Sequence, residues 1–345
     1  MSPPQAPETP LHGPGSNPDP APLPDWRARL AERGFPGARQ VPCMHGAAVL
    51  RSWGESLAAE AALRELLGRY PDDEGALRML AKLLDEGGRS DEAVQVRRRL
   101  HLRRCRELGL SGDAAVAFLD AAETGSPPPP RADEGYVAAL FDQYAEHFDE
   151  KLRGQLGYRA PECVLDAVLE VLGGRRGLDV LELGCGTGLA GVLLRPLALR
   201  LTGIDLSQGM LDRARERGIY DALVTGEITQ TLTSSEGSHE LIVAVDVLVY
   251  FGALEALFEQ VARHLVPGGL FAFTVEKSEE PGYQLRSTGR YVHSLGYLRD
   301  CARAAGLHPR VERQHVLRTE KGEPVHGHVV VLQQQQGPLQ DRLGR

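Results

Sequence analysis

Three glycines follow a short apolar stretch in the middle of the chain. The stretch from Leu178 to Leu183 is typical of a buried strand, and it leads into Gly184, Gly186 and Gly188. Glycine at alternating positions lets the backbone turn sharply and approach a ligand closely, because a Cβ atom would collide with the ligand. A strand, a glycine loop and a helix in this order place the ligand at the carboxyl edge of a sheet.

Two carboxylates accompany the glycines. Glu182 lies two residues before Gly184, and Asp205 follows a second apolar stretch, Leu201 to Ile204. A carboxylate at the end of the second strand can accept hydrogen bonds from both hydroxyls of a ribose. The pattern therefore predicts a cofactor that contains a nucleoside.

Two classes of cofactor fit such a loop. A dinucleotide site has the pattern G-x-G-x-x-G and faces a pyrophosphate, but here Gly188 comes one position early and Leu189 stands where the third glycine would fall. Glu182 is unfavourable beside a pyrophosphate and suits a cationic ligand. S-adenosylmethionine carries an ammonium and a sulfonium and no phosphate, so the charges favour it over NAD(P).

The elements around these residues alternate between strand and helix. Such alternation predicts a mostly parallel sheet that helices cover on both faces. The predicted strands are 178–183, 201–204, 222–225, 241–246, 270–275, 311–317 and 327–332, and the predicted helices are 190–199, 207–217, 253–265 and 295–305.

The order of motifs also resembles a known family. Val180 to Gly191 together with Leu201 to Leu211 resembles the first two motifs of class I S-adenosylmethionine-dependent methyltransferases, and the match continues through Leu265-Val266-Pro267-Gly268-Gly269-Leu270. The resemblance implies an α/β Rossmann-like domain with a mostly parallel seven-stranded sheet. The chain looks closest to predicted methyltransferases that carry tetratricopeptide-like repeats before the catalytic domain.

The resemblance implies roles at the methionine end of the cofactor. Gly184, Gly186 and Gly188 would wrap the methionine moiety, and Glu182 would hold its amino group. Asp246, after the fourth strand, would point toward the methionine part and the substrate.

It also implies roles at the adenosine end. Asp205 would bind the ribose hydroxyls, and Leu206 and Met210 would flank the adenine, with Glu227 facing the adenine amino group beside Ile228. For Leu206, Met210 and Ile228, plain core packing is an equally good interpretation.

A general base is useful only when the methyl acceptor carries a proton at neutral pH. His293 is the first candidate, because the unperturbed pKa of histidine is closest to neutral, and Tyr291 is the second. A surface or helix-capping role for His293, just before Ser294, is the alternative. Phe141 and Phe148 belong to a segment of helical aromatic spacing that predicts either a lid over the cofactor or an ordinary amphipathic helix.

Composition divides the chain into five segments. Prolines crowd the first 24 residues and recur as Pro127-Pro128-Pro129-Pro130, whereas leucines and alanines at helical spacing fill the stretch between. The predicted segments are a disordered Pro-rich N-terminus (1–43), a helical tetratricopeptide-like module (44–124), a Pro-rich linker (125–134), a methyltransferase domain (135–333) and a disordered tail (334–345).

The remaining sequence limits partners and location. The net charge of −8 argues against a general nucleic-acid or anionic-membrane binder, which needs a basic face. Five scattered cysteines without a ligand pattern, and no apolar stretch that could span a bilayer, predict a cytoplasmic protein without a metal. We therefore expect a methyltransferase with a small-molecule or carrier-bound acceptor and a protein partner for the helical module. The alternatives are a non-catalytic adaptor with a vestigial domain and a less favoured NAD(P)-dependent oxidoreductase.

Overall fold

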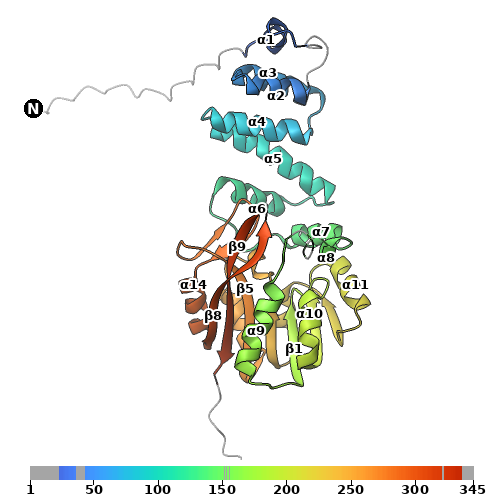
Figure 1. Cartoon of the computed structure of the whole chain (residues 1–345), viewed down its shortest axis with the longest axis vertical. Coiled ribbons are helices and arrows are strands. Elements are labelled where there is room, and N and C mark those ends of the chain that lie inside the picture. Colours follow the sequence, from blue (N-terminus) through green and yellow to red (C-terminus); the bar gives the residue numbers. More distant parts are fainter. Residues whose placement is uncertain are drawn as a thin grey trace, which may run out of the picture. The chain divides into compact units, whose positions relative to one another are not determined.

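A computed structural model describes residues 23–35, 43–150, 152, 154, 156–320 and 322–335 (Figure 1). These residues form two compact units that divide between Leu100 and His101. The division lies upstream of the predicted linker, so α6 and the Pro-rich segment belong to the second unit.

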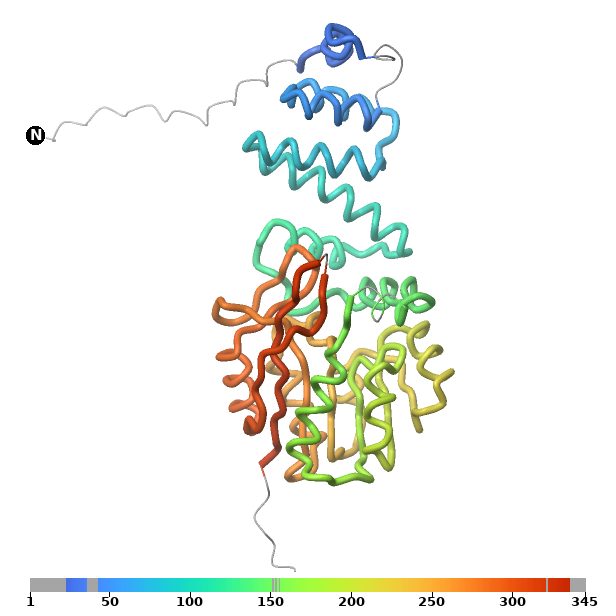
Figure 2. The backbone as a smooth tube through the Cα atoms, in the orientation of Figure 1, coloured from blue at the N-terminus to red at the C-terminus, as the bar shows by residue number. Residues whose placement is uncertain are grey.

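The first unit is helical and is traced from dark blue to cyan in Figure 2. Its helices are α1 (Trp26–Glu32), α2 (Met44–Ser52), α3 (Ser56–Arg69), α4 (Glu74–Glu86) and the first part of α5 (Ser90–Glu107). Asp73 caps α4 by accepting a hydrogen bond from the Ala76 amide, and Gly88, at a φ of 73°, turns the chain toward α5. Leucines and alanines from all five helices form one core.

Helix α1 corrects the predicted disorder of residues 1–43. Asp25 caps this helix, Trp26 and Leu30 are buried, and the Trp26 indole donates a hydrogen bond to Glu65. These contacts order a stretch whose composition alone predicts no core. Residues 1–22 and 36–42 lie outside the described part of the chain, as does the predicted tail from residue 336 onward, whereas Gln334 ends a strand.

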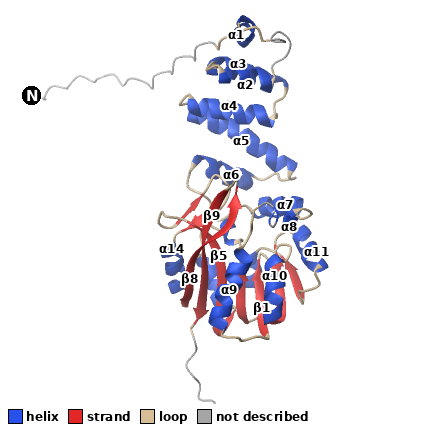
Figure 3. Ribbon diagram, in the orientation of Figure 1, coloured by secondary structure: helices blue, strands red, loops and turns tan. Residues whose placement is uncertain are grey.

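The second unit places a mixed sheet between helices (Figure 3). Its strands are β1 (Leu178–Leu183), β2 (Ala198–Asp205), β3 (Ala222–Thr225), β4 (His239–Ala244), β5 (Leu265–Lys277), β6 (Tyr283–Leu285), β7 (Tyr291–His293), β8 (Leu307–Glu320) and β9 (Glu323–Gln334). Its helices are α6 (Asp113–Thr124), α7 (Glu134–Tyr144), α8 (Phe148–Glu150), α9 (Ala160–Leu172), α10 (Leu189–Leu194), α11 (Gln208–Glu216), α12 (Ile228–Ser234), α13 (Glu255–Arg263) and α14 (Leu295–Ala304). No described helix has the length and apolarity that a membrane span requires.

The sheet has nine strands where the sequence predicts seven. Strands β3, β2, β1, β4 and β5 are parallel neighbours in that order, β9 pairs antiparallel with β5, and β8 pairs antiparallel with β9. The two additional strands are β6 and β7, a short hairpin whose strand β7 pairs with the end of β5. The sequence of this hairpin lacks a long apolar run, which is why periodicity does not predict it.

Alternate residues of the central strands serve two separate cores. Ile242 and Ala244 of β4 pack with α12, α13 and α14, whereas Leu241 and Val243 pack with α9 and α10. Residues at i and i+2 share one face of a strand, so both faces of the sheet are buried. This burial fixes the carboxyl ends of β1, β2 and β4 at one edge.

The Pro-rich segment packs against this unit and is not a free linker. The carbonyl of Pro130 accepts hydrogen bonds from the amides of Gly252 and Ala253, both at 2.8 Å. The Tyr291 hydroxyl donates to the carbonyl of Pro129 at 2.6 Å. Proline lacks an N–H but keeps its carbonyl as an acceptor, so the segment is held through oxygens.

Candidate functional site

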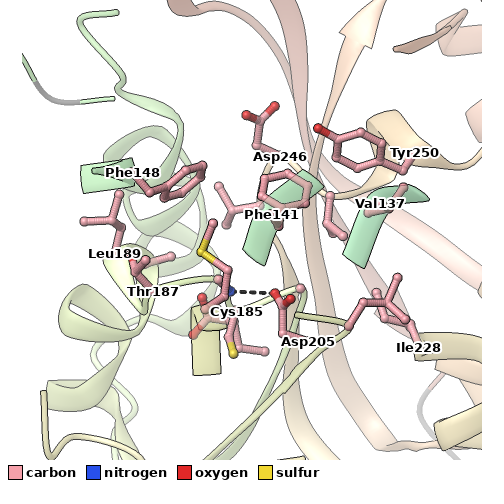
Figure 4. A pocket seen from close by; sticks show the side chains of 18 of the residues that line it. Val137, Phe141, Phe148, Cys185, Thr187, Leu189, Asp205, Ile228, Asp246 and Tyr250 are labelled. Atoms are coloured by element: carbon pink, nitrogen blue, oxygen red, sulfur yellow. Dashed lines mark hydrogen bonds between the residues drawn. The ribbon is translucent and has the colours of Figure 1, made fainter. Parts of the chain in front are cut away.

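A cavity opens at the carboxyl edge of β1, β2 and β4 (Figure 4). Figure 4 shows Asp205 and Ile228 toward one end of the cavity and Asp246 and Tyr250 toward the other. The cavity gathers nine of the ten predicted cofactor residues, namely Glu182, Gly184, Gly186, Asp205, Leu206, Met210, Glu227, Ile228 and Asp246. The tenth, Gly188, caps α10 beside the lining at a φ of 88°.

The glycines of the loop differ in what surrounds them. Gly184 has a φ of 66°, and a Cβ atom there would lie 2.4 Å from Cγ2 of Val247. Gly186 also has a positive φ, 54°, but a Cβ atom there would meet nothing within 4 Å. Gly184 is therefore required by packing, whereas Gly186 borders open space in the cavity.

Asp205 is held firmly at the end of β2. Its Oδ2 accepts a hydrogen bond from the Gly186 amide at 2.8 Å, and its Oδ1 accepts one from the Ser207 amide at 2.9 Å. Burial raises the pKa of this carboxyl, and these backbone amides oppose the rise. The carboxylate thus joins the glycine loop to the start of α11 and keeps lone pairs for a ligand.

Glu182 lies buried behind the glycine loop. Its Oε2 accepts a hydrogen bond from the Tyr220 hydroxyl at 2.7 Å. Burial raises the pKa of Glu182 to about 8, and the negative charge of Asp205 adds to the rise, whereas the Tyr220 hydroxyl lowers it. The Tyr220 ring fits only because Gly191 has no Cβ, which would lie 2.2 Å from the hydroxyl oxygen.

Glu227 and Arg131 meet near Asp205. Glu227 caps α12 through Oε2, which accepts a hydrogen bond from the Gln230 amide at 2.8 Å. Its Oε1 lies 3.1 Å from Nη1 of Arg131 but is not aligned for a hydrogen bond with it. Arg131 belongs to the Pro-rich segment, so residues on both sides of α7 line this end of the cavity.

Asp246 occupies a strained backbone conformation at the other end. Its φ is 55°, and it is the one non-glycine among the described residues with a positive φ. Its amide donates to Oγ1 of Thr274 at 2.8 Å. Its Oδ1 accepts from Nη1 of Arg318 at 3.2 Å and lies 3.4 Å from Nη1 of Arg290. Such strain costs on the order of 1–3 kcal/mol and is common where a site requires one orientation.

A bulge in β8 turns Arg318 inward. The register of β8 against β9 shifts between Val316 and Arg318, and the Arg318 side chain is 1% exposed. Its Nη2 donates a hydrogen bond to Oε1 of Glu276 on β5. An extra residue in one strand re-aims the side chains beside it, and here it delivers a guanidinium to the carboxylate of Asp246.

Two tyrosines face the same end as Asp246. Tyr158 and Tyr250 line the cavity, and their hydroxyls make no hydrogen bond with any residue in the described ranges. Burial raises the pKa of both hydroxyls, and the negative charge of Asp246 adds to each rise, so both stay protonated at neutral pH. Each hydroxyl can therefore donate a hydrogen bond to a ligand, because no described residue accepts one from it.

Asp142 of α7 and Asp149 of α8 accept hydrogen bonds that hold these two helices beside the cavity. Oδ1 of Asp142 accepts hydrogen bonds from the Ser207 hydroxyl at 2.5 Å and the Gly209 amide at 2.9 Å. Asp149 accepts from the Thr187 hydroxyl at 2.5 Å and pairs with Arg217. Phe141 and Phe148 of these helices line the cavity, with ring centroids 5.8 Å apart.

Neither predicted base lines the cavity. His293 is fully buried, its Nε2 lies 3.1 Å from the carbonyl of Gly252, and burial lowers its pKa to about 4. Tyr291 is also fully buried, and its hydroxyl is engaged by Pro129. Both residues hold the β6–β7 hairpin in place, and their position gives no support to a role as base.

Sequence reasoning missed Arg290, Arg318, Tyr158 and Tyr220. Arg290 is next to the predicted Tyr291, and alternation along β7 would have placed the two side chains on opposite faces. Tyr220 lies two residues before the start of β3, and nothing in its sequence neighbourhood indicates that it reaches Glu182.

Comparison with known proteins identifies the central part of this unit. Residues 180–269 match the methyltransferase domain family, and this range holds every predicted cofactor residue. The chain is 35% identical over 112 residues to methyltransferase-like protein 27 of Homo sapiens, which covers 32% of this chain and 45% of that protein. It is 30% identical over 153 residues to malonyl-[acyl-carrier protein] O-methyltransferase of Yersinia pestis, covering 44% and 54%. The chain thus spans about half the length of these curated relatives.

A solved structure shares the fold. The [4+2]-cyclase SpnF superimposes with a TM-score of 0.50 at 18% identity, over 60% of this chain and 99% of that chain. The likeness supports the α/β architecture. Together with the family match and the geometry of the cavity, it shows that residues 180–269 are similar to methyltransferase domains and form a part of an α/β fold that lines the cavity.

Proposed function

We propose that the chain transfers the methyl group of S-adenosylmethionine to a small-molecule or carrier-bound acceptor. The observation that carries the proposal is that Gly184, Gly186 and Asp205 meet at one cavity inside the region that matches the methyltransferase family. Two relatives support the acceptor class, because their names give a carrier-bound or a small acid as the acceptor. They are the Yersinia enzyme and trans-aconitate 2-methyltransferase of Paracidovorax citrulli.

The cofactor's adenosine lies at the Asp205 end in this proposal. Asp205 accepts from the ribose hydroxyls, because its oxygens are already oriented by the amides of Gly186 and Ser207. The adenine lies between Leu206, Met210 and Ile228. Its amino group faces Glu227, whose Oε1 has no hydrogen-bond partner in the described structure.

The methionine part extends past the glycine loop. Gly186 leaves room for it, and the Glu182 carboxylate, which also lines the cavity, would hold its ammonium. Asp246, Tyr158 and Tyr250 line the remaining part of the cavity, where the methyl acceptor would bind. Transfer is an in-line displacement with a neutral leaving group. Alignment of donor and acceptor can therefore supply roughly 7–11 kcal/mol of the barrier reduction.

Calorimetric titration with S-adenosylmethionine tests this proposal. Saturable binding to the wild type, and its loss in Asp205→Ala, is expected. The matched control is Asp166→Ala, whose aspartate lies on the exposed side of α9. Equal affinity of the wild type and Asp205→Ala would overturn the placement of the ribose. Absence of binding would favour the adaptor alternative, in which the domain is only a scaffold.

We extend the proposal to the helical unit. The consecutive helix pairs α2–α3 and α4–α5, with a glycine turn between α4 and α5, resemble tetratricopeptide-type hairpins, which bind protein segments. A chain that begins at Ser90 should bind S-adenosylmethionine as the full chain does and should methylate a macromolecular acceptor more slowly. Equal rates on that acceptor would remove the role of the helical unit.

A further inference from the structure

Two of the hydrogen-bond donors at the Asp246 end of the cavity lie outside the family match, whereas Asp246 and Tyr250 lie within it. The lining residues Tyr158 and Arg290 fall before and after the matched range 180–269, whereas Asp205 and Glu182 fall within it. The two ends also differ in chemistry: the Asp205 end offers carboxylates, and the Asp246 end offers hydrogen-bond donors. The donors therefore bear on the acceptor rather than on the ribose.

Three donors converge on this end. The hydrogen bonds of Arg290 both come from Nη1, toward Asp246 and Glu276 at 3.4 Å, so Nε and Nη2 donate to no described residue. The guanidinium lies 5.9 Å from the ring centre of Tyr250. The hydroxyls of Tyr158 and Tyr250 add two more donors, and their raised pKa values keep their protons in place.

The carboxylates at this end are paired with guanidiniums of the chain. Oδ1 of Asp246 accepts from Arg318 and faces Arg290, and both guanidiniums also pair with Oε1 of Glu276. What Arg290 still offers a ligand is the N–H groups of its Nε and Nη2. A group rich in lone pairs matches these donors.

We propose that this end of the cavity binds the methyl acceptor through a carboxylate, which Arg290, Tyr158 and Tyr250 orient, so that the product is a methyl ester. This inference rests on the proposed function. A carboxylate has lone pairs for about four hydrogen bonds and matches the planar fork of a guanidinium. A carboxylate is also attracted to the positive sulfonium, and none of the lining residues is a histidine.

The chemistry balances without a base. One carboxylate oxygen attacks the methyl carbon, the carbon–sulfur bond breaks, and its electron pair stays on sulfur. The products are a neutral methyl ester and the neutral thioether of S-adenosylhomocysteine. No proton moves, because a carboxylate is already deprotonated at neutral pH.

The nature of the methylated product tests the inference. Wild-type enzyme is incubated with methyl-tritiated S-adenosylmethionine and an extract of the source organism, and the products are treated with mild alkali. Methyl esters release volatile labelled methanol, whereas methyl groups on nitrogen, carbon, sulfur or an ether oxygen stay in place. Volatile label is expected. Alkali-stable label would overturn the carboxylate, and no label above the Asp205→Ala control would overturn the proposed function itself. Filtration through a membrane that retains proteins then separates a free acid from a carrier-bound one.

Variants of the donors test their role. Arg290→Gln should lower ester formation by about tenfold or more at limiting extract, because a hydrogen bond to a charged group is lost. Tyr250→Phe should lower it less and leaves the Asp246–Arg290 pair intact. Arg286→Gln, in the same hairpin but outside this cavity, is the matched control. Unchanged ester formation in both Arg290→Gln and Tyr250→Phe would contradict the proposed roles.

The alternative ligand for these hydrogen-bond donors is the carboxylate in the methionine part of the cofactor. S-adenosylhomocysteine carries that carboxylate and 5′-methylthioadenosine does not, so calorimetry with both separates the two. We expect Arg290→Gln to bind both as the wild type does. A selective loss of S-adenosylhomocysteine affinity would assign Arg290 to the cofactor and overturn its role toward the acceptor.

Discussion

The Tyr220 hydroxyl donates its hydrogen to Oε2 of Glu182 across 2.7 Å. This bond stabilises the ionised form of a carboxyl that burial holds at a pKa of about 8. The carboxylate form is the one that an ammonium requires. In the proposed binding mode, with the cofactor's ammonium at Glu182, binding at neutral pH therefore removes a proton from this carboxyl.

The first prediction is a pH-dependent affinity for S-adenosylhomocysteine. Affinity should rise between pH 6 and pH 8 and then level off, because less free energy is spent on deprotonating Glu182. In Tyr220→Phe the ring still fills its space and the hydroxyl is lost, so the midpoint should move to higher pH. Affinity at pH 7 should then fall about tenfold, as for a hydrogen bond to a charged group. Titration calorimetry in buffers of different ionisation enthalpy measures the number of protons released on binding. The control is Tyr70→Phe, because Tyr70 lies exposed at the end of α3.

A second prediction concerns stability without cofactor. The pKa of Glu182 is higher in the folded chain than in the unfolded one, so the folded state binds the extra proton between about pH 4.5 and pH 8. The contribution of Glu182 to stability should consequently fall as pH rises through this window. Glu182→Gln should remove that slope and raise the midpoint of urea unfolding at pH 8. Equal pH slopes for both proteins would contradict the raised pKa.

A third prediction separates two glycines of one loop. Gly184→Ala should destabilise the chain by about 1–3 kcal/mol, because its Cβ would overlap Val247 at a positive φ. Gly186→Ala adds a Cβ to open space, so it should cost only the backbone strain, about 1 kcal/mol, and should weaken S-adenosylmethionine binding more than it lowers stability. Unfolding curves and binding isotherms measured on both variants give the comparison. The same ratio of lost affinity to lost stability in Gly184→Ala and Gly186→Ala would count against the ligand-facing role of Gly186.

A fourth prediction concerns the buried Arg318. Arg318→Met should lower stability by about 3 kcal/mol, since it removes the more deeply buried of the two guanidiniums that face Glu276 and Asp246 and leaves only Arg290. The double variant Arg318→Met with Glu276→Leu should recover much of this loss, because a buried ion pair can be replaced by apolar side chains. Denaturant unfolding checks both, and a double variant weaker than the single one would show that Asp246 is the partner that matters.

A fifth prediction concerns α7. Asp142→Ala removes the acceptor of the Ser207 hydroxyl and the Gly209 amide, so the helix that carries Phe141 should separate from α11 more often. Dissociation of S-adenosylhomocysteine should become several-fold faster in stopped-flow measurements, with little change in unfolding temperature. The Asp166→Ala control should release the cofactor at the wild-type rate, and an unchanged rate in Asp142→Ala would favour plain packing over a lid.

The gathering of residues at the Asp205 end of the cavity could be predicted because these residues are close in the sequence or on neighbouring strands. Glu182 and the glycines lie within one strand and one loop, and Asp205 follows the next strand, which must be parallel to the first. The periodicity of apolar residues also indicated where β1 to β5 lie along the chain. It placed the helix after the loop at 190–199, whereas α10 ends at Leu194, because Pro196 closes a short 3₁₀ turn before β2.

The Asp246 end of the cavity could not be predicted in the same way. Arg318 depends on a bulge in β8, and Arg290 depends on a hairpin that pairs with the last residues of β5. Neither a bulge nor such a short hairpin produces a periodic pattern of apolar residues in the sequence. His293 was the natural candidate on pKa alone, and burial, which the sequence does not state, removes it from the cavity.

The β6–β7 hairpin has ends that lie next to each other. The Ser278 amide donates to the carbonyl of His293, and the Ser294 amide donates to that of Gly282. A unit whose ends meet can be exchanged as a block without moving the strands that carry the cofactor. Exchange of this hairpin would replace Arg290 and leave Tyr158, Tyr250 and the strands that carry Glu182 and Asp205 unchanged.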